Sequence, residues 1–445
     1  MFKTLIDAFK DKELRKKIFI TIGLLFLFRL GSWIPVPGIA ISEYEATIAA
    51  DGNNTFFQLL SAITGGALSN GALLALGVSP YISASIIVQL LAIAIPALER
   101  LSKQGEEGKR KLAKWTKWCA LILALAQSIG IVLSFGSEGL QPNLFGNSLW
   151  VTGAVVVLCL TAGAMFCYWL GEKITELGVA NGLSLLIFVG ILSTAATSLF
   201  DFVTGANGDQ SIVADPSKLW VLALFIAVLI LIFACIVTMD SAERKVKVQY
   251  AKQIKGRKMY GGQSTFIPVR LMGTGVMPII FAMSFISFPQ ILMSIFGASY
   301  EEGTFSYWWA KYMGTGASGA GVSWVYIVVS TLLILFFAYF YAQLSFNPED
   351  ISKQIQSNGG FIPGTRPGKP TADLLKKISN RITLFGAIFL AFIAIVPTII
   401  FQLIESSLVN AFSATGMIII VGVALEVEKQ LQTQMMMKNY KGFLK

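Results

Sequence analysis

Residues 56–100 read FFQLLSAITGGALSNGALLALGVSPYISASIIVQLLAIAIPALER, and the chain from Asn54 onward carries no charge until Glu99. A bilayer core about 30 Å thick needs roughly 20 apolar residues for one helical span, so the stretch is too long for a single span. Glycines interrupt its first part and Ser79-Pro80 its second, so we expect a short half-inserted helix over roughly 56–69, followed by a full span. Irregular backbone at membrane depth is tolerated where it is buried in protein or lines an aqueous cavity, which predicts a pore or a carrier. An ordinary helix hairpin with close glycine contacts is the alternative.

The composition indicates a polytopic membrane protein. Of its 445 residues, 55% are hydrophobic and 13% are charged, and the mean hydropathy is +0.68, whereas a soluble domain carries about 25% charge. The first apolar run is long enough to span a membrane, so we expect no cleaved signal peptide. The chain has no histidine, and its four cysteines form no C-x-x-C pair. Because nucleotide-binding and protease motifs are also missing, we expect no enzyme activity, no metal and no cofactor.

Apolar runs long enough to cross a membrane recur along the whole chain. We expect ten spans, at 18–37, 73–95, 115–136, 150–170, 179–200, 219–239, 272–296, 319–343, 383–402 and 408–427.

The basic residues alternate between the two sides of these spans. Nearly all of the 35 lysines and arginines fall before the first span, in every second loop and in the C-terminal tail. Short loops rich in lysine and arginine stay in the cytoplasm, so we expect both termini to be cytoplasmic.

Five spans in each half mean that the second half must enter the membrane from the side opposite to the first. We therefore expect an all-α protein of two inverted five-helix halves, with a functional pathway at their interface. The expected units are a first half over 1–200, an external linker over 201–218, a second half over 219–427 and a cytoplasmic tail over 428–445.

Two cytoplasmic loops, at about 242–271 and 345–381, are too long to be simple connectors. The first contains the alternating run VKVQY and the turn-forming GRKMYGG, which predict a protruding β-hairpin. In the second, Asn347 and Pro348 begin a short helix that ends near Asn358, and a turn-rich tip, FIPGTRPGKP, follows. The first loop holds eight basic residues and the second holds six. We expect these residues to control the topology and, in addition, to favour an acidic docking partner such as ribosomal RNA.

The apolar spans distinguish between two kinds of pathway. An ion-coupled transporter needs acids or histidines inside the bilayer, and the span cores contain none. Arg29 is the single deep charge, and we expect it to snorkel toward an interface rather than to make a structural pair. Isoleucines stand one turn apart in two spans, where they could form an apolar collar or ordinary core contacts. A polypeptide is the expected cargo, and a small solute is the alternative.

The chain closely resembles the SecY family of protein-conducting channels. The resemblance runs nearly end to end and is carried by WIPVPG at 33–38, ITGGALSN at 63–70, GVSPYISASIIVQLL at 77–91, AQSIGI at 126–131, NGLSLLIF at 181–188, QYAKQIKGRKMYGGQSTFIPVRL at 249–271, GVMPIIFA at 275–282, FNPEDI at 346–351, GGFIPGTRPGKPT at 359–371 and LQTQMM at 431–436. It implies an hourglass channel with a central pore, closed by a short plug helix near 57–70, and a lateral gate between spans two and three on one side and seven and eight on the other.

The resemblance also implies sites at matching positions of this sequence. The pore ring falls on Ile82, Ile86, Ile187, Ile191, Ile280 and Ile419. The plug contains Phe57, Leu60, Ile63, Gly65, Gly66 and Leu68. The lateral gate contains Ser83, Ile87, Gln89, Gln127, Thr274 and Met283. The docking loops present Arg257, Lys258, Arg366 and Lys369.

The resemblance also implies binding partners for these sites. They are the small membrane subunits SecE and SecG, the motor ATPase SecA, the ribosome, signal sequences and nascent polypeptides, and membrane lipids. The implied location is the bacterial cytoplasmic membrane, across which unfolded polypeptides pass and into which transmembrane segments are released.

Overall fold

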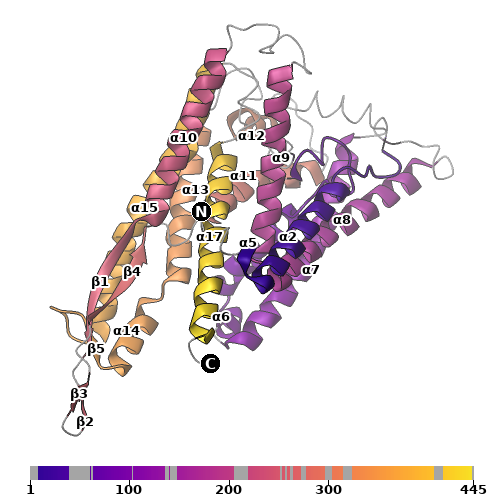
Figure 1. The fold of residues 1–445 in the computed structure, drawn as a ribbon. Coiled ribbons are helices and arrows are strands. Elements are labelled where there is room, and N and C mark those ends of the chain that lie inside the picture. The colour runs from indigo at the N-terminus through magenta and orange to yellow at the C-terminus, as the bar shows by residue number, and fades with distance from the viewer. Residues whose placement is uncertain are drawn as a thin grey trace.

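The molecule is a bundle of long helices with a small β-sheet at one end (Figure 1). The computed structural model describes residues 9–39, 61, 64–102, 104–135, 140, 148–204, 219–250, 253–255, 258–260, 264–271, 277–295, 303–313, 323–404 and 414–442.

Within these residues, each of the ten predicted spans overlaps one long helix. The helices are α2 (Lys12–Gly31), α5 (Ser79–Ala94), α7 (Glu106–Phe135), α8 (Leu149–Leu177), α9 (Gly182–Thr204), α10 (Leu219–Ser241), α11 (Met277–Ile295), α13 (Trp324–Ser345), α15 (Lys369–Ile404) and α17 (Ala414–Gly442).

Length and composition alone mark only some of these helices as spans. In the described part of the chain, four helical stretches are long and apolar enough to cross a membrane, at Glu106–Leu133, Leu149–Leu177, Trp324–Ser357 and Lys369–Val396. Shorter apolar helices are Ser79–Ala94, Gly182–Thr197, Ile226–Ser241 and Met277–Ile286. Large apolar side chains such as Trp118 and Phe385 are exposed on the outer faces of the bundle, as expected for helices that face lipid.

Several predicted boundaries were wrong for identifiable reasons. The first helix covers 12–31 rather than 18–37, since the chain leaves it in turns just before Pro35. The second begins at Ser79 rather than at 73, because residues before it form turns and Gly77 takes φ +52°, and Pro80 then occupies the first turn. The ninth begins at Lys369 rather than at 383, because its polar first part extends the helix beyond the apolar run.

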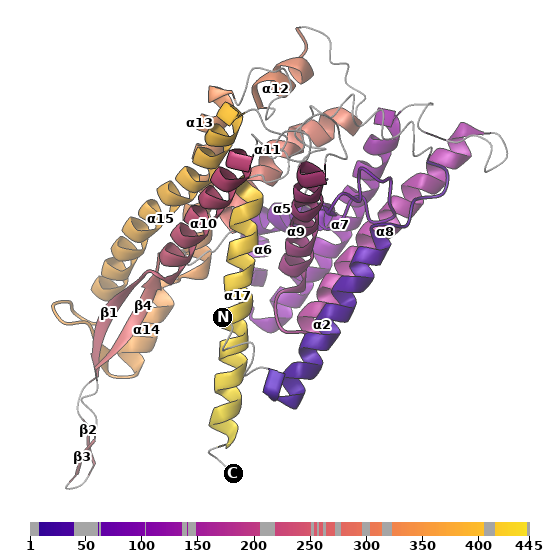
Figure 2. The same cartoon turned by 45° about the horizontal axis from the view of Figure 1, so that its top comes forward.

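The helices fall into two groups that follow the chain. Helices α2, α5, α7, α8 and α9 lie together, and α10, α11, α13, α15 and α17 form the other group (Figures 1 and 2). The groups meet on one side where α11 packs against α7 and α5, and on the other where α17 packs against α9. The inverted relation of the two halves stays a prediction.

The two long loops fold together at one end of the bundle. Strand β1 (Glu243–Tyr250) pairs antiparallel with β4 (Ser264–Arg270), from Glu243 opposite Arg270 to Gln249 opposite Ser264, which confirms the predicted hairpin. Strand β1 also pairs with β5 (Gly360–Phe361) of the other loop, a contact that the sequence did not predict. The tip strands β2 (Gln253–Lys255) and β3 (Lys258–Tyr260) extend away from the helices (Figure 2).

The short helices complete the loops. Helix α14 (Pro348–Ser357) begins where predicted, because the Oδ1 atom of Asn347 accepts a hydrogen bond from the N–H of Glu349. Its Ile355 packs with Val248 of β1 and Leu375 of α15 in a separate apolar cluster, so the second loop is tied to both the sheet and the bundle. Helices α6 (Pro96–Ser102) and α12 (Phe305–Met313) are further short elements.

Candidate functional site

The six isoleucines of the predicted pore ring are all buried and belong to one apolar cluster at the centre of the bundle. They are Ile82 and Ile86 on α5, Ile187 and Ile191 on α9, Ile280 on α11, and Ile419 on α17. In the first half, α5 and α9 contribute two residues each, and in the second half α11 and α17 contribute one each. The cluster therefore joins the two halves through branched apolar side chains, which offer no hydrogen bond to anything that lies between them.

Helix α17 approaches α9 closely beside this cluster. A Cβ atom added at Gly416 would lie 3.0 Å from Cγ2 of Ile191, so glycine at this position lets the two helices meet next to the isoleucines. That these side chains line one passage stays a prediction.

The predicted plug helix does not continue through residue 70. Helical residues end at Thr64, and residues 65–70 form turns, because Gly65 and Gly66 take φ values of +71° and +80°. Such left-handed backbone ends a right-handed helix and favours glycine. The prediction of helix over the last part of 57–70 was therefore wrong. Phe57, Leu60 and Ile63 lie outside the described residues, and Leu68 is fully buried.

The turn at residues 65–70, which follows the predicted plug helix, lies against α9 next to a predicted ring residue. A Cβ atom on Gly65 would lie 3.1 Å from the carbonyl oxygen of Gly190 on α9, and Gly190 directly precedes the ring residue Ile191. A hydrogen bond of 2.9 Å between the hydroxyls of Ser61 and Ser69 closes the turn back toward the helix.

Arg29 holds this turn in place. Its Nη1 atom donates a 2.7 Å hydrogen bond to the carbonyl oxygen of Gly65 and lies 3.3 Å from the Oγ atom of Ser32. Its guanidinium carbon lies 5.7 Å from the ring centroid of Trp33. The expectation that Arg29 snorkels was therefore wrong, because the side chain makes a structural pair with the plug turn.

The predicted gate residues occupy the helices that join the two halves. On α5, Ser83 is buried and Ile87 and Gln89 are half-buried, and on α11 Met283 is half-buried. The Sδ atom of Met283 lies 3.5 Å from the hydroxyl of Tyr326 on α13, within the second half. Thr274 lies outside the described residues.

Gln127 is one of three buried polar residues of α7, with Thr116 and Ser128, and this helix packs against both α5 and α11. The side-chain amide of Gln127 is inaccessible to solvent and has no hydrogen-bond partner among the described residues. An unpaired buried amide group costs about 1–3 kcal/mol, so the packing of α5, α7 and α11 around Gln127 is less favourable than packing around an apolar side chain would be.

Tyr341 contacts Gln89, one of the predicted gate residues, and the sequence did not predict this contact. From α13, its hydroxyl donates a hydrogen bond to Oε1 of Gln89 on α5. A tyrosine near the end of an apolar span is common at a membrane interface, so no signal in the sequence distinguished Tyr341 from its neighbours.

The turn-rich tip between β5 and α15 presents the predicted docking residues. Arg366 and Lys369 are exposed, and the tip is ordered by hydrogen bonds from Thr371 Oγ1 to the carbonyl oxygen of Arg366 (2.8 Å) and from Ser352 Oγ to that of Gly368 (2.7 Å). Of the other loop, Arg257 lies outside the described residues, and Lys258 is described only through its backbone in β3.

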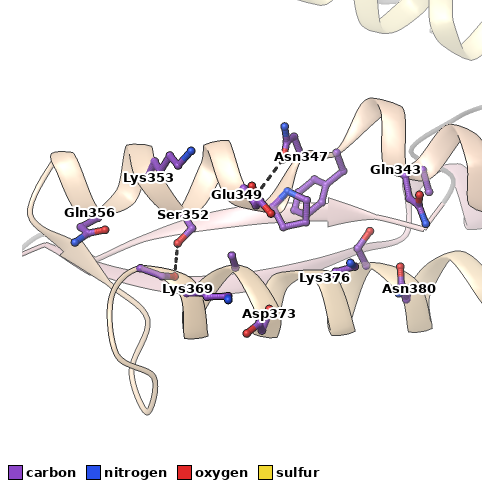
Figure 3. Close-up of a pocket in the computed structure, with 16 residues that line it drawn as sticks. Gln343, Asn347, Glu349, Ser352, Lys353, Gln356, Lys369, Asp373, Lys376 and Asn380 are labelled. Carbon is purple, nitrogen blue, oxygen red and sulfur yellow. Dashed lines mark hydrogen bonds between the residues drawn. The ribbon is translucent and has the colours of Figure 1, made fainter. Parts of the chain in front are cut away.

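A groove of about 520 Å³ with both polar and apolar lining residues lies between α14 and the start of α15. Figure 3 shows Lys353, Lys369 and Lys376 around it together with Glu349 and Asp373. The groove carries both signs of charge, and its wall is continuous with the tip that holds Arg366.

Comparisons with known proteins agree with this architecture. A SecY family model matches residues 72–427. The protein translocase subunit SecY of Mycobacterium tuberculosis strain H37Rv is 38% identical over 454 aligned positions, covering 100% of both chains, and that of Streptomyces coelicolor is 37% identical over 453, with the same coverage.

Solved channels share the fold. A structure described as “The structure of a protein conducting channel” has a TM-score of 0.66 at 20% identity and covers 94% of this chain and 92% of its own. Sec61 in a canine ribosome-channel complex has a TM-score of 0.60 at 19% identity, with the same coverage. The full-length identity to the bacterial relatives and the match over 72–427 show that this chain belongs to the SecY family.

Proposed function

We propose that this chain is the channel subunit of a bacterial protein translocase, which conducts unfolded polypeptides across the cytoplasmic membrane and releases transmembrane segments sideways into it. The observation that carries the proposal is the position of the turn at Gly65 against Gly190, beside a central cluster that contains all six predicted ring isoleucines. An apolar constriction suits a cargo of varied chemistry, because it excludes water and ions without binding any one side chain. Membership of the SecY family supports the same function. Members of the family are channel subunits rather than enzymes, so the proposal includes no catalytic step.

The proposed orientation places the sheet, α14 and both termini in the cytoplasm, where basic loops remain. The tip with Arg366 and Lys369, together with the β2–β3 hairpin, would dock the ribosome or the motor ATPase SecA. Related channels are described in ribosome complexes, namely Sec61 in a canine ribosome-channel complex and yeast Ssh1 on the 80S ribosome. SecE and SecG are the proposed small membrane partners, and their capture with this chain on purification would support the assignment.

The test is reconstitution. The purified chain with its co-purifying subunits is placed in proteoliposomes, and protease protection of a labelled preprotein is measured with SecA and ATP. Protected, full-length preprotein is the expected result. Accumulation of a small solute, with no protected preprotein in vesicles that contain correctly assembled complex, would overturn the proposal in favour of a solute carrier.

A further inference from the structure

Helix α12 carries a row of exposed aromatic side chains. It packs against α11 and α13 at the end of the bundle opposite the sheet (Figure 2). Phe305 is 61% exposed and Trp308 is 45% exposed, although both side chains are large and apolar. Apolar side chains gathered on one face of a short helix indicate a surface that contacts something other than water.

The residues of α12 divide first into a buried face and an aromatic face. Ser306 and Met313, seven residues apart, are buried. Phe305, Trp308 and Tyr312 follow at spacings of three and four, so they share a different face of the helix. The ring centroids of Phe305 and Trp308 lie 6.4 Å apart, and those of Trp308 and Tyr312 lie 5.1 Å apart. The aromatic row is therefore continuous along two turns.

Lys311 marks a third, polar face. Its side chain is exposed, and its Nζ atom lies 5.6 Å from the ring centroid of Tyr307. A lysine beside an apolar surface can keep its stem there while its ammonium group reaches water or phosphate. A helix that lies flat in a membrane surface and also packs on a protein needs one face for protein, one for hydrocarbon and one for headgroups. Helix α12 has these three faces.

Exposed tryptophans mark the membrane surface at the same end of the molecule. Helices α8, α10 and α13 all begin there (Figures 1 and 2), and each has an exposed tryptophan within its first two residues, namely Trp150, Trp220 and Trp324. Tryptophan is enriched where a span leaves the hydrocarbon. Because α12 packs against α11 and α13, which cross the hydrocarbon, its aromatic row lies at the level of this belt.

A lipid surface fits the aromatic row better than a protein partner does. A stable protein interface takes roughly 20–30 residues from each side, whereas the row is one side chain wide on a helix of nine residues. Lipid needs no matching shape, and its phosphate groups complement the charge of Lys311, the charged residue of α12.

We infer that α12 docks on the phospholipids of the leaflet at the end opposite the sheet, which is the outer leaflet in the proposed orientation. The aromatic row lies among the glycerol groups and upper acyl chains, and Lys311 reaches the phosphates. Since α12 packs against both α11 and α13, its docking fixes the depth at which these two helices end. The inference requires only that the chain spans a membrane, so it stands or falls separately from polypeptide transport.

A nitroxide scan of α12 tests the inference in the assembled complex, reconstituted in bilayers of phosphatidylethanolamine and phosphatidylglycerol. The four native cysteines are replaced by alanine, and Trp308→Cys, Lys311→Cys or Met313→Cys carries the label. Collisions with oxygen, which concentrates in hydrocarbon, are compared with collisions with a water-soluble nickel chelate. We expect the oxygen-to-nickel ratio to be severalfold higher at 308 than at 311, and both reagents to be excluded at 313.

A second comparison tests whether the aromatic row holds the helix at this depth. With the label at Tyr312→Cys, Phe305→Gln should shift the label toward nickel, because an amide side chain favours water over hydrocarbon. Trp150→Gln is the matched control, since it removes an exposed aromatic side chain from α8 and leaves α12 intact. It should leave the label at 312 unchanged.

Two results would overturn the inference. Equal nickel access at Trp308→Cys and Lys311→Cys would mean that the row faces water. Exclusion of both reagents at Trp308→Cys would mean that a protein surface covers the row. If the cysteine-free chain does not assemble, a spin-labelled unnatural amino acid at the same positions of the native chain provides the same comparison. Thermal unfolding of each complex confirms that the compared variants are folded.

Discussion

The Nη1 atom of Arg29 donates a 2.7 Å hydrogen bond to the carbonyl oxygen of Gly65. The donor belongs to the first long helix, and the acceptor opens the turn that follows the proposed plug. Because Gly65 also lies against Gly190 on α9, one contact connects the first helix, the plug turn and the helix that carries Ile191. The single charge deep in the first span is therefore used to hold a turn in place.

Replacing Arg29 with Met should loosen the plug turn. A hydrogen bond from a charged donor contributes about 1.5–3 kcal/mol, so its loss should raise the population with a displaced plug roughly tenfold or more. The measurement is resting ion conductance of the purified complex in planar bilayers. Arg15→Met is the control, since Arg15 is an exposed residue of the same helix. Equal conductance of the two variants would show that Arg29 does not hold the closed state.

Alanine at Gly65 should open the channel more than alanine at Gly66. Both glycines have positive φ, so each substitution carries the strain of a left-handed residue, about 1–2 kcal/mol. Only at Gly65 does the new Cβ atom meet neighbours, 2.8 Å from Arg29 Nη1 and 3.1 Å from the Gly190 carbonyl oxygen, while nothing lies within 4 Å at Gly66. Conductance that rises equally in both variants would assign the effect to backbone strain alone.

Replacing two isoleucines of the predicted ring with asparagine should let water into the apolar constriction. In Ile86→Asn/Ile191→Asn, polar groups replace two buried apolar side chains, so water and ions gain a favourable path through the constriction. We expect a standing single-channel conductance and transport of preproteins with weakly apolar signals. Ile388→Asn is the control because Ile388 is exposed on the outer face of α15. An electrically silent double variant that is fully assembled would remove these isoleucines from the pathway.

Reversing the charge of Arg366 should weaken docking without unfolding the loop. Its side chain is exposed, and its backbone carbonyl accepts the bond from Thr371 whatever the side chain is. We expect Arg366→Glu to lower the affinity for SecA and the rate of transport about tenfold or more at low salt, with a smaller effect at moderate salt because the interaction is electrostatic. Lys377→Glu makes the same charge change at another exposed residue of the loop. SecA binding by Arg366→Glu at the wild-type level would exclude this residue from the interface.

Much of the architecture could be predicted because its signals are local. Apolar runs mark the helices, since each one must cover about 30 Å of hydrocarbon. Alternation in VKVQY marked β1, and Asn347-Pro348 marked the start of α14, since strand pleating and helix capping depend on a few neighbouring residues. The resemblance of whole segments, such as GVSPYISASIIVQLL, was enough to identify the family.

Contacts between distant segments could not be read in this way. Helix boundaries at Ser79 and Lys369 depend on turns and polar extensions that hydropathy does not register. The pairing of β1 with β5 joins two loops more than a hundred residues apart. The bonds of Arg29 to Gly65 and of Tyr341 to Gln89 likewise join residues 36 and 252 positions apart. A side chain's hydrogen-bond partner is set by which helices pack together. The sequence by itself therefore determined the spans, the loops and the family, and the tertiary structure decided what holds the turn at Gly65 and which side chains join α13 to α5.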